Sequence, residues 1–258
     1  MVDYHRVSGG NILTHGTFFE HLDELRKRLF IALGAYLVAG VVPWIYSDRL
    51  LEFLVSPLTQ TAGPAYFFSP ADAFIVKVKV SLLAAALLSS PVALGQLWLF
   101  ISPALYGGEK KILLPLIFIT CGFFLAGAAF SFFEVIPTAL HFLIGMQTEF
   151  MKPMVSVSEY VSFVTSMVLA FGIAFNLPVF VLALVGSGVL QAKMLHQFQR
   201  AAILIIFIAA AVLTPGPDVA SQLLLAVPLL VLFEISVLCA VILERLRKKK
   251  NARVLVHD

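Results

Sequence analysis

The residues of this chain that could do chemistry gather first in a short segment near the N-terminus, residues 18–30, which reads FFEHLDELRKRLF. Three acids precede three bases there, an order that suits the dipole of a helix. Two acid–base pairs stand four residues apart in the stabilising order: Glu24 with Arg28, and Asp23 with Lys27. The segment predicts an amphipathic helix with its own ion pairs. Its composition leaves open whether a carboxylate instead binds a cationic ligand.

Residues typical of enzymes, metal sites and phosphate sites are sparse in the rest of the sequence. Cys121 and Cys239 fall inside apolar runs, as small buried side chains do, and show no metal spacing or disulfide framework. The six histidines have no evident serine or acid partner, and the sequence contains neither His-Glu-x-x-His nor a glycine-rich phosphate loop. We therefore expect no catalytic residue, no metal and no cofactor. The protein is not expected to be an enzyme, which disfavours an intramembrane protease.

The composition is that of an integral membrane protein. Of the 258 residues, 60% are hydrophobic and 13% are charged, and the mean hydropathy is +0.97. A soluble domain carries roughly 25% charged residues. The polar stretch 1–28 is not expected to hold a cleavable signal peptide. We expect a single membrane domain over 1–258, with a cytoplasmic amphipathic segment (1–28), a six-span bundle (29–243) and a basic cytoplasmic tail (244–258).

Six apolar runs predict membrane-spanning helices, each of which needs about 20 apolar residues. The last two runs are short, and the turn Thr-Pro-Gly-Pro at 214–217 separates them because a helix cannot continue there. Two outer loops, 47–71 and 134–158, are longer than simple turns and are expected to be partly helical caps. The predicted spans are 29–46, 79–103 (with a start near Asp72 as an option), 112–133, 160–185, 201–213 and 218–243.

The basic residues predict the orientation. Of the 18 Lys and Arg residues, fourteen fall on one set of span ends and four on the other, and the richer side is cytoplasmic. Both termini are therefore expected in the cytoplasm, which requires an even number of spans, and the basic tail is expected to attract anionic lipids. The fold class is an all-α polytopic membrane protein with six transmembrane helices. We expect a concave, open bundle whose wall includes Gln96, Asn176, Gln222 and Glu234.

Four blocks of sequence carry a family resemblance. HLDELRKRL precedes the first span, and SSPVALGQLWLFISPALYGGEKK covers the second span and the loop after it. LAFGIAFNLPV lies in the fourth span, and LTPGPDVASQLLLAVPLLVLFEIS covers the last turn and the sixth span. In this order, and over nearly the whole chain, the blocks resemble the TatC family, the polytopic subunit of the twin-arginine protein translocase.

The resemblance implies a binding site for export signal peptides that carry two consecutive arginines. Glu24 in HLDELRKRL and Glu109 in ALYGGEKK match the acids that take the arginine pair. A guanidinium presents a planar fork of donors that matches a carboxylate, whereas an ammonium cannot fill both positions. Phe100 and Pro103 match an aromatic and a proline that shape the site. Arg26 matches the basic residue of the motif, where we expect a structural or lipid contact.

The resemblance also implies polar positions within the membrane that contact partner helices, together with an outer-loop proline, Pro57. Asp218 and Gln222 stand one helical turn apart at the start of the sixth span, and Asp218 could equally cap that helix. Glu234 sits between apolar runs, where an ionisable group is costly and indicates function. The family usually carries an acid in the fourth span, and this chain has Asn176. An amide keeps the hydrogen bonds of that position and loses its charge.

The implied function is that of a receptor and core subunit that binds twin-arginine signal peptides at its cytoplasmic face. It would assemble, in several copies, with single-span partner subunits of the TatA and TatB types and with membrane lipids. Export of folded proteins would be driven by the proton gradient across the cell inner membrane, with no nucleic acid involved. The alternative is a small-molecule secondary transporter, against which the sequence lacks paired broken helices in two matching halves.

Overall fold

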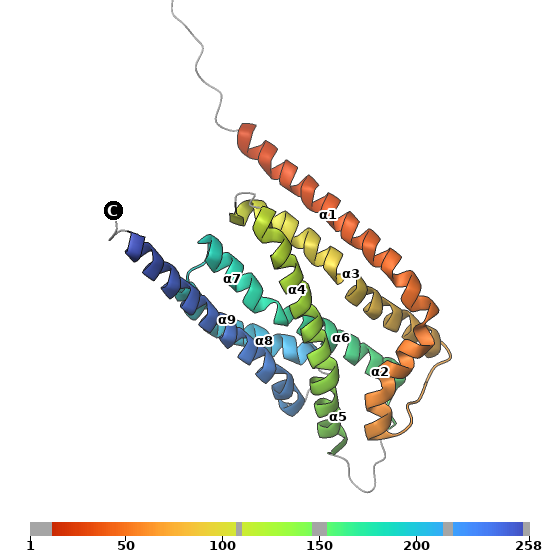
Figure 1. The fold of residues 1–258 in the computed structure, drawn as a ribbon. Helices are drawn as coiled ribbons and strands as arrows, with labels where there is room; N and C mark the ends of the chain where they lie inside the picture. The colour runs from red at the N-terminus through yellow and green to blue at the C-terminus, as the bar shows by residue number, and fades with distance from the viewer. Residues whose placement is uncertain (1–11, 107–109, 146–153, 214–218, 255–258) are drawn as a thin grey trace, which may run out of the picture.

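The structure of this protein is a computed structural model that describes residues 12–106, 110–145, 154–213 and 219–254. These residues form nine α-helices and one five-residue π-helical segment, η1 (Figure 1). In chain order the elements are α1 (Ile12–Ile45), α2 (Ser47–Ala62), α3 (Asp72–Tyr106), α4 (Lys110–Phe130), η1 (Ser131–Val135), α5 (Ile136–Gly145), α6 (Val157–Phe175), α7 (Leu177–Ser187), α8 (Ala192–Leu213) and α9 (Val219–Val254).

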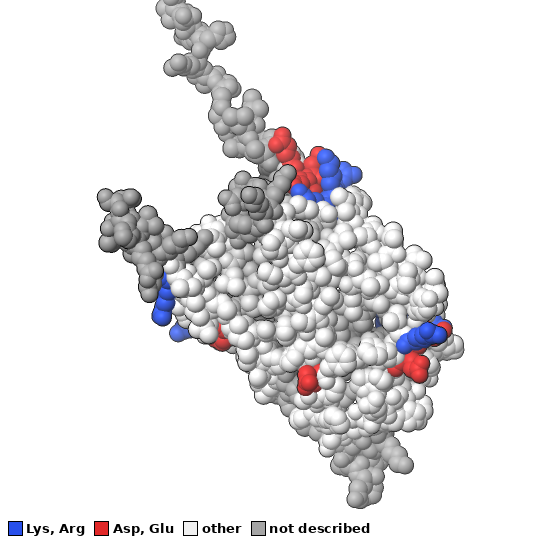
Figure 2. Space-filling model, in the orientation of Figure 1, with Lys and Arg blue, Asp and Glu red and all other residues white. Residues whose placement is uncertain are grey.

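The prediction of six spans is confirmed. The start of α1 and the end of α9 lie at the same end of the molecule, and α2 and α5 lie at the other (Figure 1). Figure 2 shows charged side chains at the start of α1 and beside α2, with a broad uncharged surface between them. The fifth and sixth spans, of 20 and 22 residues, are the shortest. The six stretches are Phe19–Ile45, Asp72–Ile101, Leu113–Gly145, Val157–Ser187, Lys193–Val212 and Leu225–Leu246.

The amphipathic segment 18–30 is continuous with the first span rather than a separate interfacial helix. It forms part of α1, whose 34 residues run without a break. At 1.5 Å per residue this helix is about 51 Å long, about 20 Å more than the hydrocarbon core of a bilayer. The first turns of α1 therefore extend beyond the membrane on a rigid support.

The third span is longer than predicted, because α4, η1 and α5 form one helical rod to Gly145. The N–H of Ile136 donates to the carbonyl of Ser131, five residues back. This π turn shifts the hydrogen-bond register immediately before Pro137, which has no N–H to donate. The second outer loop consequently begins after Gly145, and its predicted helical part extends the span instead of capping it.

The fifth span also begins earlier than predicted, at Lys193 rather than at 201, within α8, which starts at Ala192. Its first turns carry long polar side chains such as Lys193 and Arg200, which can keep a charged head in water while their stems cover apolar surface. The fourth span ends two residues later than predicted, because α7 continues to Ser187 and Gly188 caps it with a positive φ of 85°.

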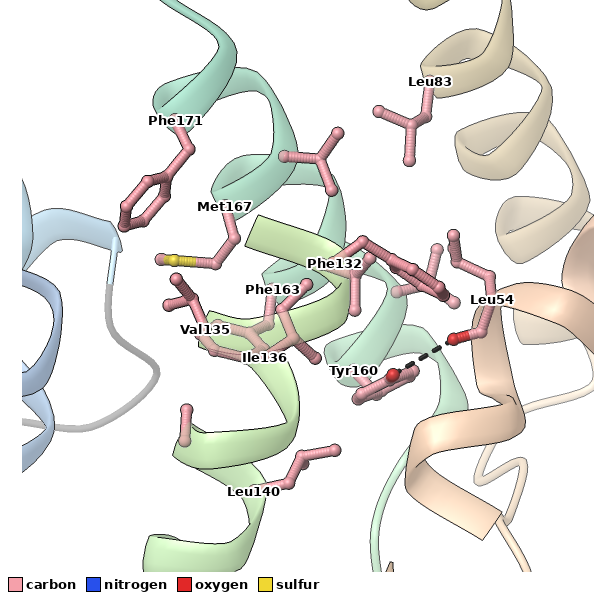
Figure 3. Close-up of a cluster of buried hydrophobic side chains, with 14 of the residues drawn as sticks. Leu54, Leu83, Phe132, Val135, Ile136, Leu140, Tyr160, Phe163, Met167 and Phe171 are labelled. Carbon is pink, nitrogen blue, oxygen red and sulfur yellow. Dashed lines mark hydrogen bonds between the residues drawn. The ribbon is translucent and has the colours of Figure 1, made fainter. Parts of the chain in front are cut away.

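The first outer loop is helical, as predicted, and α2 covers the end of the bundle opposite the start of α1 (Figure 1). Tyr66 pairs with Ser156 in an isolated bridge, which ties this region to the start of α6. The largest apolar core lies beneath α2, between α3, the α4–η1–α5 rod and α6 (Figure 3). There the buried Tyr160 hydroxyl donates to the carbonyl of Leu54 at 3.0 Å.

The first and fifth spans lie at the edges of the bundle. In the described part of the chain, α1 packs mainly on α3, and α8 packs mainly on α9. Within the most apolar stretch of α1, 6% of the residues are buried. The centre is tight by contrast, because Gly127 of α4 faces the backbone of α6. A Cβ at this position would lie 2.5 Å from the carbonyl oxygen of Phe171.

Candidate functional site

The carboxylate of Glu24 already binds a guanidinium. Arg28, one turn further along α1, donates to Glu24 Oε1 from Nε at 2.9 Å and from a terminal nitrogen as well. The second carboxylate oxygen, Oε2, lies 3.9 Å from Nδ1 of His21. The other predicted pair, Asp23 with Lys27, is not formed in the part of the chain that the structure describes. Of the two predicted ion pairs, the one present is therefore that of the candidate site residue.

Helix α3 supplies the facing wall of this site. Phe100 stacks on His21, with ring centroids 4.3 Å apart and an angle of 19° between the planes. Gln96, one turn earlier on α3, accepts a long hydrogen bond of 3.5 Å from Arg28. A cavity of about 140 Å³ lies beside these side chains, lined by both helices and almost wholly apolar apart from Arg28 and Gln96. The sequence alone did not predict the contribution of His21, although its place three residues before Glu24 was a signal.

Arg26 points elsewhere. Its guanidinium lies over the ring of Phe30, 5.7 Å from the centroid, a geometry typical of a cation–π contact. Both residues are exposed on α1. This contact lies within α1, and the structural or lipid role expected of Arg26 stays a prediction.

Two of the predicted site residues, Glu109 and Asp218, lie outside the described residues. Glu109 directly precedes Lys110, the first residue of α4, and follows Tyr106, the last residue of α3, by three positions. For Pro103 the structure describes the backbone, within the last turns of α3, but not the side chain. The end of α3 that carries Phe100 therefore leads directly into the stretch that holds Glu109.

Asn176 interrupts the fourth span, between α6 and α7. Its side chain is 1% exposed, and its amide nitrogen donates to the carbonyl of Gly172 at 2.9 Å. The side-chain oxygen, Oδ1, is buried and has no hydrogen-bond partner among the described residues. Pro178 follows within the first turn of α7, which explains the break because proline cannot donate to the preceding turn. The position thus keeps an unused acceptor inside the bundle.

The last two helices hold the remaining polar residues. Gln222, on α9, donates to the carbonyl of Phe207 on α8 at 2.9 Å. Glu234 lies in the middle of the sixth span, is exposed on the protein surface, and accepts a hydrogen bond from Gln199 of α8. It borders an open apolar cavity of about 500 Å³ along α9. Gln96, Asn176, Gln222 and Glu234 therefore have separate polar partners within the described residues.

Pro57 lies inside α2, although a proline in an outer loop usually indicates a rigid turn. A proline in a helix leaves the carbonyl four residues earlier without its usual donor. Here that carbonyl belongs to Phe53, and the hydroxyl of Ser56 donates to it at 2.8 Å. Pro57 also borders a cavity of about 270 Å³ between α2 and the rod of η1 and α5.

Lys79 has a polar environment within the second span that the sequence did not predict. Its ammonium donates to Ser162 Oγ at 2.7 Å, to Ser158 Oγ at 3.3 Å and to the Ser158 carbonyl at 3.5 Å. These acceptors lie on α6, so the interaction joins two spans. The position of Lys79 near the start of an apolar run was the available signal.

Comparisons with known proteins agree on one family. Residues 20–228 match the family model described as "Sec-independent protein translocase protein (TatC)". The chain is 38% identical to TatC of Carboxydothermus hydrogenoformans over 224 residues, which cover 87% of this chain and 92% of the relative. It is 41% identical to TatC of Helicobacter pylori strain J99 over 220 residues, which cover 85% and 87% of the two chains.

A solved structure is similar as well. The crystal structure of the twin arginine translocase receptor TatC matches with a TM-score of 0.80 and 36% sequence identity, over 87% of this chain and 99% of the other. The match to the family model spans most of the sequence, and the relatives are covered almost end to end. This chain therefore belongs to the TatC family.

Proposed function

We propose that this protein is the receptor and core subunit of a twin-arginine translocase, and that it binds twin-arginine signal peptides at the end of the bundle that carries Glu24. The observation that carries the proposal is that the Glu24 carboxylate already accepts two hydrogen bonds from a guanidinium. This carboxylate is partly exposed and lies on the unbroken helix α1. An arginine of a peptide can make the same contacts, because its guanidinium has the same donors in the same arrangement as that of Arg28. A lysine cannot replace both donors.

The second arginine of the pair would be taken by Glu109. In support, Phe100 stacks on His21 and so holds the end of α3 against the turn of Glu24, and the chain reaches Glu109 within three residues of the last residue of α3. A residue spans at most about 3.6 Å, so the link between Tyr106 and Glu109 is short. Phe100 and Pro103 would shape the peptide site, and Arg26 would support α1 through Phe30 and the lipid.

The test is the binding of a fluorescent twin-arginine peptide, and of its twin-lysine counterpart, to the purified protein in detergent. We expect the arginine peptide to bind more tightly, and we expect Glu24→Ala with Glu109→Ala to abolish the difference. Glu159→Ala, an exposed acid at the start of α6, is the matched control. Equal affinity of the two peptides, or unchanged binding to the double variant, would refute the proposal.

The partners would be single-span subunits of the TatA and TatB types, in a complex of several copies. The exposed side of α9 supports this, because it combines an apolar surface with Glu234, an ionisable group in mid-span that a partner helix can satisfy. Gln222, Asn176 and Asp218 would supply further polar contacts. The test is to measure how much of these subunits co-purifies with the Glu234→Leu variant. An amount equal to that recovered with the unchanged protein would contradict a role for Glu234.

The complex would reside in the cell inner membrane with both termini in the cytoplasm and would use the proton gradient. Support for the orientation comes from the excess of basic residues at one set of span ends. The orientation can be tested by placing single cysteines near residue 20 and near residue 64 and labelling intact cells with a membrane-impermeant reagent. We expect only the cysteine near residue 64 to react. No observation in the described residues favours the alternative of a small-molecule transporter.

A further inference from the structure

We propose that Arg28 is an internal occupant of the guanidinium site of Glu24, that a signal peptide must displace it, and that Gln96 receives the displaced guanidinium. The inference rests on the proposed function and adds to it a residue that sets the strength of peptide binding. Arg28 would hold the receptor in a self-occupied state until a peptide of sufficient affinity arrives.

The geometry around Arg28 carries the inference. Two of its nitrogens donate to the same oxygen of Glu24, Oε1, while the third, a terminal nitrogen, lies 3.5 Å from Gln96 Oε1 on α3. One guanidinium therefore already touches two acceptors on two helices. A small rotation of the Arg28 side chain can therefore break its hydrogen bonds to Glu24 and strengthen the one to Gln96, while both helices stay in place.

The second oxygen of Glu24 gives a peptide its point of entry. Within the described residues Oε2 accepts no hydrogen bond from a guanidinium, and His21 Nδ1 lies 3.9 Å from it. An incoming arginine can bind Oε2 first and then take Oε1 as Arg28 leaves. The side chain of Glu24 is 36% exposed and that of Arg28 is 21% exposed, so the carboxylate is the more accessible of the two.

Gln96 suits a temporary acceptor. It is half-buried at the wall of the 140 Å³ cavity between α1 and α3, where neighbouring side chains are apolar. Its amide oxygen is neutral and binds a guanidinium less strongly than a carboxylate does. Arg28 would therefore return to Glu24 when the peptide leaves.

The expected effect follows from competition. The apparent affinity of a ligand is its intrinsic affinity multiplied by the fraction of receptor molecules in which the binding site is free. A partly exposed ion pair with two hydrogen bonds would keep the site occupied in most molecules, so its removal should tighten peptide binding about three- to tenfold. Because both peptides must displace Arg28, the ratio of twin-arginine to twin-lysine affinity should stay the same.

The experiment compares Arg28→Gln with Lys27→Gln by peptide binding in detergent. Lys27 is exposed at the position just before Arg28 and forms no ion pair within the described residues, so its substitution removes the same charge and leaves Glu24 untouched. We expect tighter binding for Arg28→Gln and a change of less than about twofold for Lys27→Gln. A similar gain in both variants would mean general charge repulsion, and weaker binding to Arg28→Gln would mean that Arg28 supports the site. Either result overturns the inference.

A second pair of variants tests Gln96 and separates the two proposals. Gln96→Leu should weaken peptide binding about two- to fivefold in the unchanged protein and should have no effect in Arg28→Gln, because the displaced guanidinium is then absent. Equal effects in both backgrounds would refute the role of Gln96. If Glu24→Ala leaves binding unchanged, the proposed function fails. If Glu24→Ala abolishes binding while Arg28→Gln brings no gain, the inference about Arg28 fails and the proposed function stands.

Discussion

The contact between α4 and α6 gives the most direct test of how the bundle is held together. Gly127 of α4 lies against α6 so closely that an added Cβ would stand 2.5 Å from the Phe171 carbonyl oxygen and 2.8 Å from Phe175 Cβ. Ordinary carbon contacts lie at about 3.5–4.0 Å. The variant Gly127→Ala must therefore push the two helices apart by roughly 1 Å.

A matched control lies on the same helix. Gly122, also in α4, would meet nothing within 4 Å if it carried a Cβ. Both substitutions to alanine gain the same helix propensity of about 1 kcal/mol, so the difference between them reports the clash alone. Overpacking of a tight contact costs about 1–3 kcal/mol, and about 2–4 °C of melting temperature corresponds to each kcal/mol in a chain of this size. We expect Gly127→Ala to unfold about 6 °C below Gly122→Ala.

The assay heats each purified variant in the same detergent for a fixed time and measures the monodisperse fraction by size-exclusion chromatography. Comparison at one heating schedule avoids dependence on scan rate, which affects proteins that unfold irreversibly. A midpoint for Gly127→Ala equal to or above that of Gly122→Ala would show that α4 and α6 do not approach as closely as described, and the packing argument would fail.

Two further predictions concern hydrogen bonds that join distant elements. Tyr160→Phe removes the bond to the Leu54 carbonyl and should lower the free energy of unfolding by about 0.5–1.5 kcal/mol, whereas Tyr66→Phe, at an exposed ring, should leave the thermal midpoint unchanged. Ser162→Ala removes the shortest acceptor of Lys79 and should cost about 1.5–3 kcal/mol, as bonds to charged groups do. Addition of Lys79→Met should recover most of that loss in the same thermal assay, and a purely additive double variant would contradict the coupling.

The number of spans and several of their ends could be predicted because they depend on local composition. The apolar runs identify six helices, Asp72 opens α3 by accepting hydrogen bonds from the N–H groups of Phe68 and Ser69, and Gly188 closes α7. These signals lie within a few residues of the feature that they determine.

The structure differs from the sequence predictions where a local interaction satisfies backbone groups that a proline leaves unpaired. Pro57 and Pro137 indicate turns by their chemistry, yet a serine hydroxyl and a π turn satisfy the helix around them. The polar start of α8 lies outside the apolar run that predicts the fifth span, yet it is helical because the stems of Lys193 and Arg200 can cover apolar surface. The contact of Gln96 with Arg28 likewise depends on how α1 packs on α3, which residue types alone do not indicate.

For the candidate site, the spacing of Glu24 and Arg28 predicted an ion pair that is formed, whereas the role of Glu109, taken from family resemblance, stays a prediction. The contact of His21 with Phe100 could not be predicted from the sequence, because the two residues lie far apart in the chain and meet only through the packing of α1 on α3. Nor could the contact of Lys79 with Ser158 and Ser162 be predicted, for the same reason.

The unbroken course of α1 makes the angular position of Glu24 a property of the whole first span. An inserted residue between Glu24 and the membrane part would rotate the carboxylate by about 100° and raise it by about 1.5 Å. Such a rotation would carry it away from Gln96 while every side chain of the motif was retained. The helical phase of the span, and not the motif alone, thus fixes the direction in which the receptor presents its charge.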